Sequence, residues 1–139
     1  SGVYVFGFLI TYLVVETYNK SSLLSSVFIV NLLWLPCFEN LFSIIRRFSL
    51  KKVQITSADK RHLNHLLDRL LIKKYKLNNN LSSTITGIVI NFYYLLTITL
   101  AYNFMWNRTI NIIILLFNVL FYVIVYIELL KTNYKIKII

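Results

Sequence analysis

The chain is organised around residues 56–69, which read Thr-Ser-Ala-Asp-Lys-Arg-His-Leu-Asn-His-Leu-Leu-Asp-Arg and hold both of its histidines. Successive residues of an α-helix are about 100° apart, so His62, His65 and Arg69 fall within a sector of roughly 60°. Asp59 lies beside them, and we call these four residues the polar stripe. The neighbouring sector is apolar: Leu63, Leu66, Leu67 and Leu70. The pattern therefore predicts one amphipathic helix, with leucines packed inward and the polar stripe facing an anion or a metal.

The predicted start of this helix is Thr56. Asp59 follows it three residues later, which is typical of a capping box. The amides next to such a start, at Ser57 and Ala58, would be free to bind an anion such as phosphate.

The composition is that of a membrane protein. Of the 139 residues, 58% are hydrophobic and only 14% are charged, and the mean hydropathy is +0.67. The charges are clustered, which leaves long runs without any. Such a composition predicts an all-α, polytopic membrane protein rather than a soluble domain. One cysteine excludes an intrachain disulfide.

Four transmembrane helices are predicted, at about 3–18, 23–45, 84–104 and 109–130. Most of the 15 lysines and arginines lie in the loop 46–83 between the second and third spans. The positive-inside rule places this loop and the C-terminus in the cytosol, with the amphipathic helix inside the loop. Because the net charge of +10 is concentrated beside the membrane, we expect anionic lipid and phosphorylated substrates as partners, and no nucleic acid.

Local signals refine the spans. Pro36 should kink the second span and free the carbonyl of Leu32, which neighbouring helices must then satisfy. Glu39 lies about one turn later and is either an interfacial carboxylate, paired with Arg46 or solvated by water, or a functional group. The polar run 78–83 predicts a turn that ends the loop, and residues 105–108 predict a tight turn between the last two spans.

Three interpretations of the polar stripe remain open. Two histidines three residues apart could share a zinc ion, although a catalytic zinc site normally has three protein ligands. A solvated basic loop could bind anionic lipid head groups. Imidazole, guanidinium and the neighbouring Asn64 amide are also the donors that a diphosphate needs. We favour phosphate recognition, because it uses the whole arrangement.

Three segments, in order, carry a resemblance to a known family. Ser1-Gly2 precedes an aromatic run at 4–8, Pro-Cys-Phe-Glu-Asn at 36–40 leads into Arg46-Arg47, and residues 59–67 read Asp-Lys-Arg-His-Leu-Asn-His-Leu-Leu. They resemble the Gly-Asp-Ser-Gly, Pro-x-x-Asp/Glu-Thr and Asp-x-x-His-x-His-His-Leu-Leu segments of the polyprenyl-phosphate N-acetylhexosamine-1-phosphate transferases. That family includes the undecaprenyl-phosphate GlcNAc-1-phosphate and phospho-MurNAc-pentapeptide types. The chain departs from the pattern at Asn64, where many members have a histidine.

The resemblance implies a membrane enzyme of cell-envelope polysaccharide synthesis. It would transfer a sugar-1-phosphate from a UDP-N-acetylhexosamine donor to a polyprenyl phosphate, release UMP and use Mg²⁺. It implies a bacterial inner-membrane location and makes residues 1–139 the C-terminal part of one transferase domain. The catalytic aspartate is expected just before Ser1, so this part alone should hold no catalytic residue or metal ligand and should be inactive.

The residues that the resemblance assigns to substrate binding lie in two segments. Arg46 and Arg47 would attract phosphate, His62 and His65 would contact the diphosphate, and Asp59 and Asn64 would shape that contact. The alternative is a non-catalytic membrane component whose basic loop binds anionic lipid or a partner protein.

Overall fold

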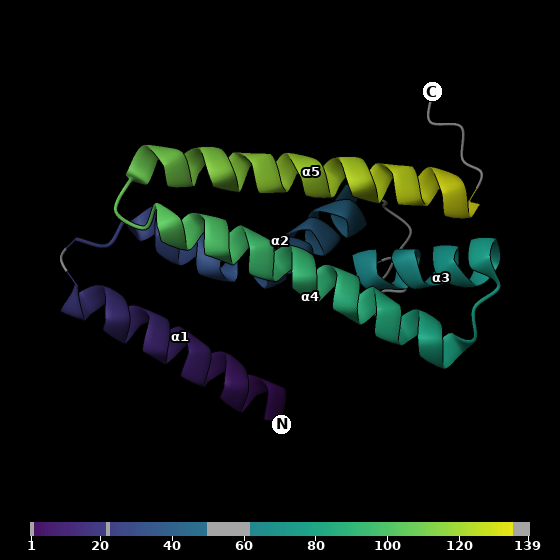
Figure 1. Cartoon of the computed structure of the whole chain (residues 1–139), viewed down its shortest axis with the longest axis horizontal. Helices are drawn as coiled ribbons and strands as arrows, with labels where there is room; N and C mark the ends of the chain where they lie inside the picture. Colours follow the sequence, from purple (N-terminus) through teal and green to yellow (C-terminus); the bar gives the residue numbers. More distant parts are fainter. Residues whose placement is uncertain (1, 22, 50–61, 135–139) are drawn as a thin grey trace.

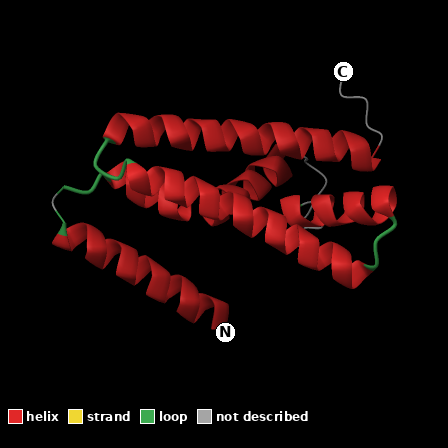
Figure 2. Ribbon diagram, in the orientation of Figure 1, coloured by secondary structure: helices red, strands yellow, loops and turns green. Residues whose placement is uncertain are grey.

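The computed structural model describes residues 2–21, 23–49 and 62–134, and this part of the chain is entirely α-helical (Figures 1 and 2). In chain order its helices are α1 (Gly2–Lys20), α2 (Ser26–Ser49), α3 (Leu63–Tyr75), α4 (Asn79–Asn103) and α5 (Arg108–Tyr134). The all-α prediction is therefore confirmed.

Three of the helices, α2, α4 and α5, are long and apolar enough to cross a membrane. Large apolar side chains on their surfaces are exposed, for example Phe92 and Phe117, as expected of surfaces that face lipid. Among the described residues, α1 (Gly2–Lys20) is not one of these three helices. The described chain thus supports a membrane protein with three candidate spans, and the fourth span at about 3–18 stays a prediction.

The two ends of the helix bundle differ in character. At one end, the amide of Ser25, between α1 and α2, donates to the carbonyl of Met105 in the α4–α5 turn at 3.1 Å. At the other end, α3 packs against α4 and α5 (Figure 1). There Asn133 Nδ2 donates to the Leu66 carbonyl at 2.8 Å, and Lys73 Nζ donates to the Asn133 carbonyl at 3.0 Å. These contacts attach α3 to the C-terminal end of α5.

The core lies where α2, α3 and α5 meet. Leu66 of α3 is fully buried against aromatic residues of the other two helices, including Trp34 and Tyr126. Phe42 of α2 packs edge-on against Tyr126, with 4.8 Å between the ring centroids. Leu63, Leu67 and Leu70 pack against the same core, as the predicted leucine sector requires. The core therefore fixes the position of α3 against the bundle.

Buried amides hold the apolar helices together, a feature that the sequence reasoning missed. Asn31 Nδ2 of α2 donates to both the carbonyl and the Oδ1 of Asn111 in α5, at 3.0 Å. Asn118 Oδ1 accepts from the Tyr93 hydroxyl of α4 at 3.1 Å. In a membrane such side chains act as polar contacts between helices. The seven-residue spacing of Asn111 and Asn118, two turns of one helix face, was the available signal.

The local predictions have mixed outcomes. The carbonyl of Leu32 accepts a hydrogen bond from the Tyr94 hydroxyl of α4, which confirms that a neighbouring helix satisfies the group freed by Pro36. The turn at 105–108 is confirmed in that α4 ends at Asn103 and α5 begins at Arg108. The predicted turn at 78–83 is wrong, because α4 begins at Asn79 and residues 79–83 form its first turn and a half. Polar residues with helical neighbours simply extend the helix beyond its apolar part.

Candidate functional site

The predicted helix at residues 56–69 begins later than expected. Its first residue is Leu63, and His62 is the N-cap, with extended backbone angles of φ −62° and ψ 154°. The prediction that His62 lies inside the helix is therefore wrong. Asp59 and the capping residue Thr56 lie outside the described residues. The first amide of the helix, that of Leu63, donates a hydrogen bond to an acceptor on another helix.

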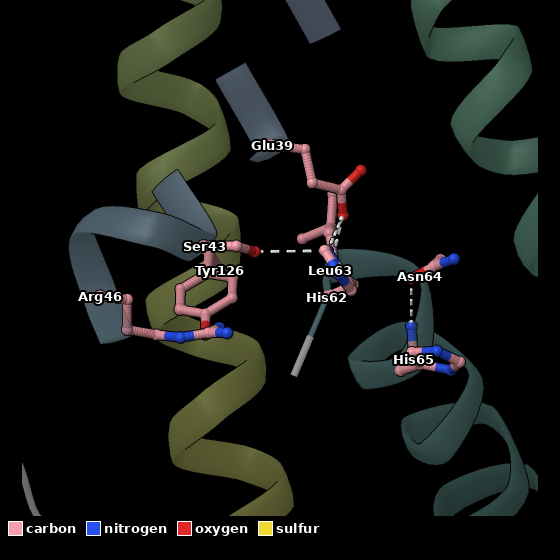
Figure 3. Close-up of polar contacts among 8 residues, drawn as sticks. All are labelled: Glu39, Ser43, Arg46, His62, Leu63, Asn64, His65 and Tyr126. Carbon is pink, nitrogen blue, oxygen red and sulfur yellow. Dashed lines mark hydrogen bonds and ion pairs between the residues drawn. The ribbon is translucent and has the colours of Figure 1, made fainter. Parts of the chain in front are cut away.

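That acceptor is Glu39 of α2. Its Oε1 accepts a hydrogen bond from the Leu63 amide at 3.0 Å and lies 3.5 Å from His62 Nδ1 (Figure 3). A carboxylate at this position satisfies a helix-start amide and interacts favourably with the positive end of the helix dipole. Ser43 Oγ lies 3.4 Å from the same His62 nitrogen. Glu39 thus positions the start of α3, a role that the sequence did not predict.

His62 and His65 are neighbours despite the later helix start. Their ring centroids are 6.5 Å apart. His62 is half-buried, whereas Asn64 and His65 are exposed. Asn64 Oδ1 accepts from the His65 amide at 2.9 Å. In Figure 3, Asn64 and His65 lie on the side of α3 away from Glu39. His62 therefore lies between α2 on one side and Asn64 and His65 on the other.

The two arginines lie elsewhere. Arg46 donates to the Tyr126 hydroxyl of α5, and its guanidinium carbon lies 5.6 Å from the centre of the Tyr126 ring. Figure 3 places Arg46 and Tyr126 on the α2–α5 side of His62, opposite His65. Arg47 is half-buried near the end of α2. The structure thus brings His62 together with Glu39 and with His65, but it does not bring Arg46 to His65.

A cavity lined mainly by polar residues lies beside His65, between α3 and α4. It is lined by Asn64, His65 and Asp68 from α3 and by Ser83, Thr86 and Gly87 from α4, and its volume is about 250 Å³. The Ser82 hydroxyl donates to Asp68 and so holds that carboxylate at the edge of the cavity. Sequence reasoning missed this cavity because it depends on how α4 packs against α3.

A second, apolar cavity lies next to the start of α3. Leu63 and Leu67 of α3 line it together with side chains of α2, α4 and α5, among them Tyr93, Phe121 and Tyr122, and its volume is about 210 Å³. The start of α3 therefore borders two cavities. One is lined by polar residues of α3 and α4, and the other by apolar residues of α2, α3, α4 and α5.

The described residues do not form a metal site. In the part of the chain that the structure describes, no group of three or more His, Cys, Asp or Glu side chains could hold a metal ion. Neither zinc nor magnesium binding can be derived from the described residues.

Comparisons of the chain with protein-family models, with curated proteins and with solved structures found no match. The geometry at the start of α3 is therefore what constrains a functional hypothesis.

Proposed function

We propose that this chain is part of an integral membrane transferase that moves a sugar-1-phosphate from a UDP-N-acetylhexosamine donor to a polyprenyl phosphate and releases UMP. In this proposal the start of α3 binds the donor's diphosphate. One observation supports it most directly. Glu39 contacts His62 and Leu63, so two separate segments of the sequence resemblance meet at one point.

The chemistry of this point suits a diphosphate. Imidazole nitrogens of His62 and His65 and the side-chain amide of Asn64 can all donate to phosphate oxygens. Held 6.5 Å apart, the two rings can contact neighbouring phosphate groups of one diphosphate. Glu39 fixes the backbone next to His62 and thereby orients that ring. The role of these residues is to bind and orient the donor rather than to react with it.

The lipid acceptor would approach from the bilayer. Leu63, which directly follows His62, lines the apolar cavity together with Leu67. This cavity would accommodate the first apolar units of a polyprenyl chain. This arrangement would place the lipid phosphate at the membrane surface near the donor.

Magnesium is implied only by the sequence resemblance. When bound, Mg²⁺ would neutralise the negative charge of the diphosphate. Its ligands and the catalytic aspartate would be supplied by sequence upstream of Ser1. The proposal further takes α1 to be a fourth span and the loop 46–83 to face the cytosol of a bacterial inner membrane, with α3 as its amphipathic helix.

The test uses the full-length protein in membranes with a radiolabelled UDP-N-acetylhexosamine and polyprenyl phosphate. His62→Ala and His65→Ala should each lower the rate of lipid-linked sugar phosphate formation by about 10²-fold or more at unchanged expression, as expected when groups that position a reacting substrate are lost. Asn64→His replaces one phosphate donor of the proposed site with another instead of removing a donor. It should therefore keep activity.

Two results would contradict the proposal. Full activity of both histidine variants would remove the diphosphate site from α3. Loss of function only on replacing Lys73, Lys74 and Lys76 with Gln would instead favour the non-catalytic alternative, a basic surface that binds anionic lipid.

A further inference from the structure

We infer that the cavity between α3 and α4 binds the neutral, hydroxyl-bearing sugar ring of the donor, and that Asp68 and Thr86 determine which sugar is accepted. This inference rests on the proposed function, because it assigns the part of the donor next to the diphosphate. It adds a binding site on α4, a helix that the sequence resemblance does not involve.

Thr86 is the first observation. Thr86 is 4% exposed, and its Oγ1 is buried without a hydrogen-bond partner in the described chain. Buried hydroxyls nearly always have a partner, because an unpartnered one loses its interaction with water. Thr86 also lines the cavity. A rotation of its side chain toward the cavity would let a ligand hydroxyl supply the missing hydrogen bond.

The charge of the cavity disfavours phosphate. Among the described residues that line it, Asp68 is the only acidic one, and the Ser82 hydroxyl holds the Asp68 carboxylate in place. A carboxylate repels a phosphate group, whereas it accepts hydrogen bonds readily from hydroxyl groups. The cavity thus suits the neutral part of a nucleotide sugar and leaves the diphosphate to the histidines.

The set of polar groups matches a ring that carries several hydroxyls. Asp68 accepts, Asn64 both donates and accepts, and Thr86 can do either. Ser83 Oγ donates to the Asn80 carbonyl, so its lone pairs remain available to accept. Gly87 has no side chain and leaves room at the α4 wall. A sugar hydroxyl could find a partner on each side of the cavity.

The size and position agree with this ligand. A volume of about 250 Å³ is below the roughly 300–1,000 Å³ of pockets that hold drug-sized ligands, so the cavity suits a single ring rather than a whole nucleotide sugar. His65 belongs both to the cavity and to the proposed diphosphate site. A donor bound through both would extend directly from one to the other.

The test measures binding of UDP, UDP-glucose, UDP-N-acetylglucosamine and UDP-N-acetylgalactosamine to the purified full-length protein by calorimetry. The wild type should bind one of the UDP-sugars more tightly than UDP. Thr86→Val keeps the shape of the side chain, and it should reduce this preference about five- to tenfold while leaving UDP affinity unchanged. Asp68→Asn should change the ranking of the sugars.

Thr99→Val is the matched control. Thr99 lies on the same helix, is exposed, and bonds only within its own helix, to the Leu95 carbonyl at 2.9 Å. This variant should keep the wild-type preference. A full preference in Thr86→Val, or a wild type that binds every UDP-sugar no better than UDP, would overturn the inference while leaving the diphosphate site intact. A wild type that binds neither UDP nor any UDP-sugar would overturn both.

Discussion

Glu39 connects the helix before the basic loop to the helix within it. Its carboxylate accepts from the Leu63 amide, the first amide of α3. Removing such a cap typically costs about 1 kcal/mol, so Glu39→Ala should speed hydrogen exchange at the start of α3 by roughly fivefold. Glu39→Gln keeps an acceptor oxygen and should have a smaller effect. Hydrogen exchange with mass spectrometry on peptides that contain Leu63 and Leu66 measures both.

Asn40→Ala is the control for this prediction, because Asn40 is adjacent and exposed. It should leave exchange in α3 unchanged. Equal exchange in Glu39→Ala and the wild type would show that α3 starts without help from α2.

Residue-level features were predictable only where they depend on local spacing. The leucine spacing predicted the buried side of α3, whereas His62 and His65 are neighbours although His62 precedes the helix. The cap could not be predicted, because a helical period does not say which distant residue approaches the helix start. The cavity at Thr86 could not be predicted either, because it depends on how α4 packs against α3.

At the scale of a single element, α2 remains one helix through Pro36, and α4 compensates for the missing bond. Tyr94→Phe removes the donor to the Leu32 carbonyl and should lower the free energy of unfolding by about 1 kcal/mol. In a Pro36→Ala background the cost should be smaller, because residue 36 then has an amide that can bond to Leu32. Unfolding by denaturing detergent, measured for all four proteins, gives the coupling.

Tyr102→Phe is the control on the same helix, because Tyr102 is exposed. It should be neutral in both backgrounds. An equal cost of Tyr94→Phe with and without Pro36 would show that the hydroxyl does not replace the lost bond.

Helix positions were more predictable than helix ends. The apolar runs located α2, α4 and α5, since twenty or so apolar residues leave few alternatives to a long helix. Their ends were set by polar residues such as those at 79–83, which continue α4 beyond its apolar part. Hydropathy measures where a helix meets lipid, not where its backbone stops.

For the whole molecule, the packing puts chemically different groups at opposite ends of the bundle. The α1–α2 connection and the α4–α5 turn share one end through the Ser25–Met105 bond, whereas α3 and its lysines occupy the other. If the positive-inside rule holds, the α3 end faces the cytosol. We therefore expect a cysteine at Tyr75, which is exposed, to react with a membrane-impermeant maleimide only after cells are permeabilised.

The same experiment tests whether α1 is a fourth span. In a Cys37→Ser background, Trp106→Cys marks the opposite end and should react in intact cells. Thr11→Cys lies near the middle of α1, and it should resist labelling on both sides if α1 crosses the bilayer, because maleimide reaction requires water. Labelling of Thr11→Cys would instead place α1 at the membrane surface, where its polar final turn is already suited to lie. Labelling of Tyr75→Cys in intact cells would reverse the orientation and remove α3 from the compartment that holds nucleotide sugars.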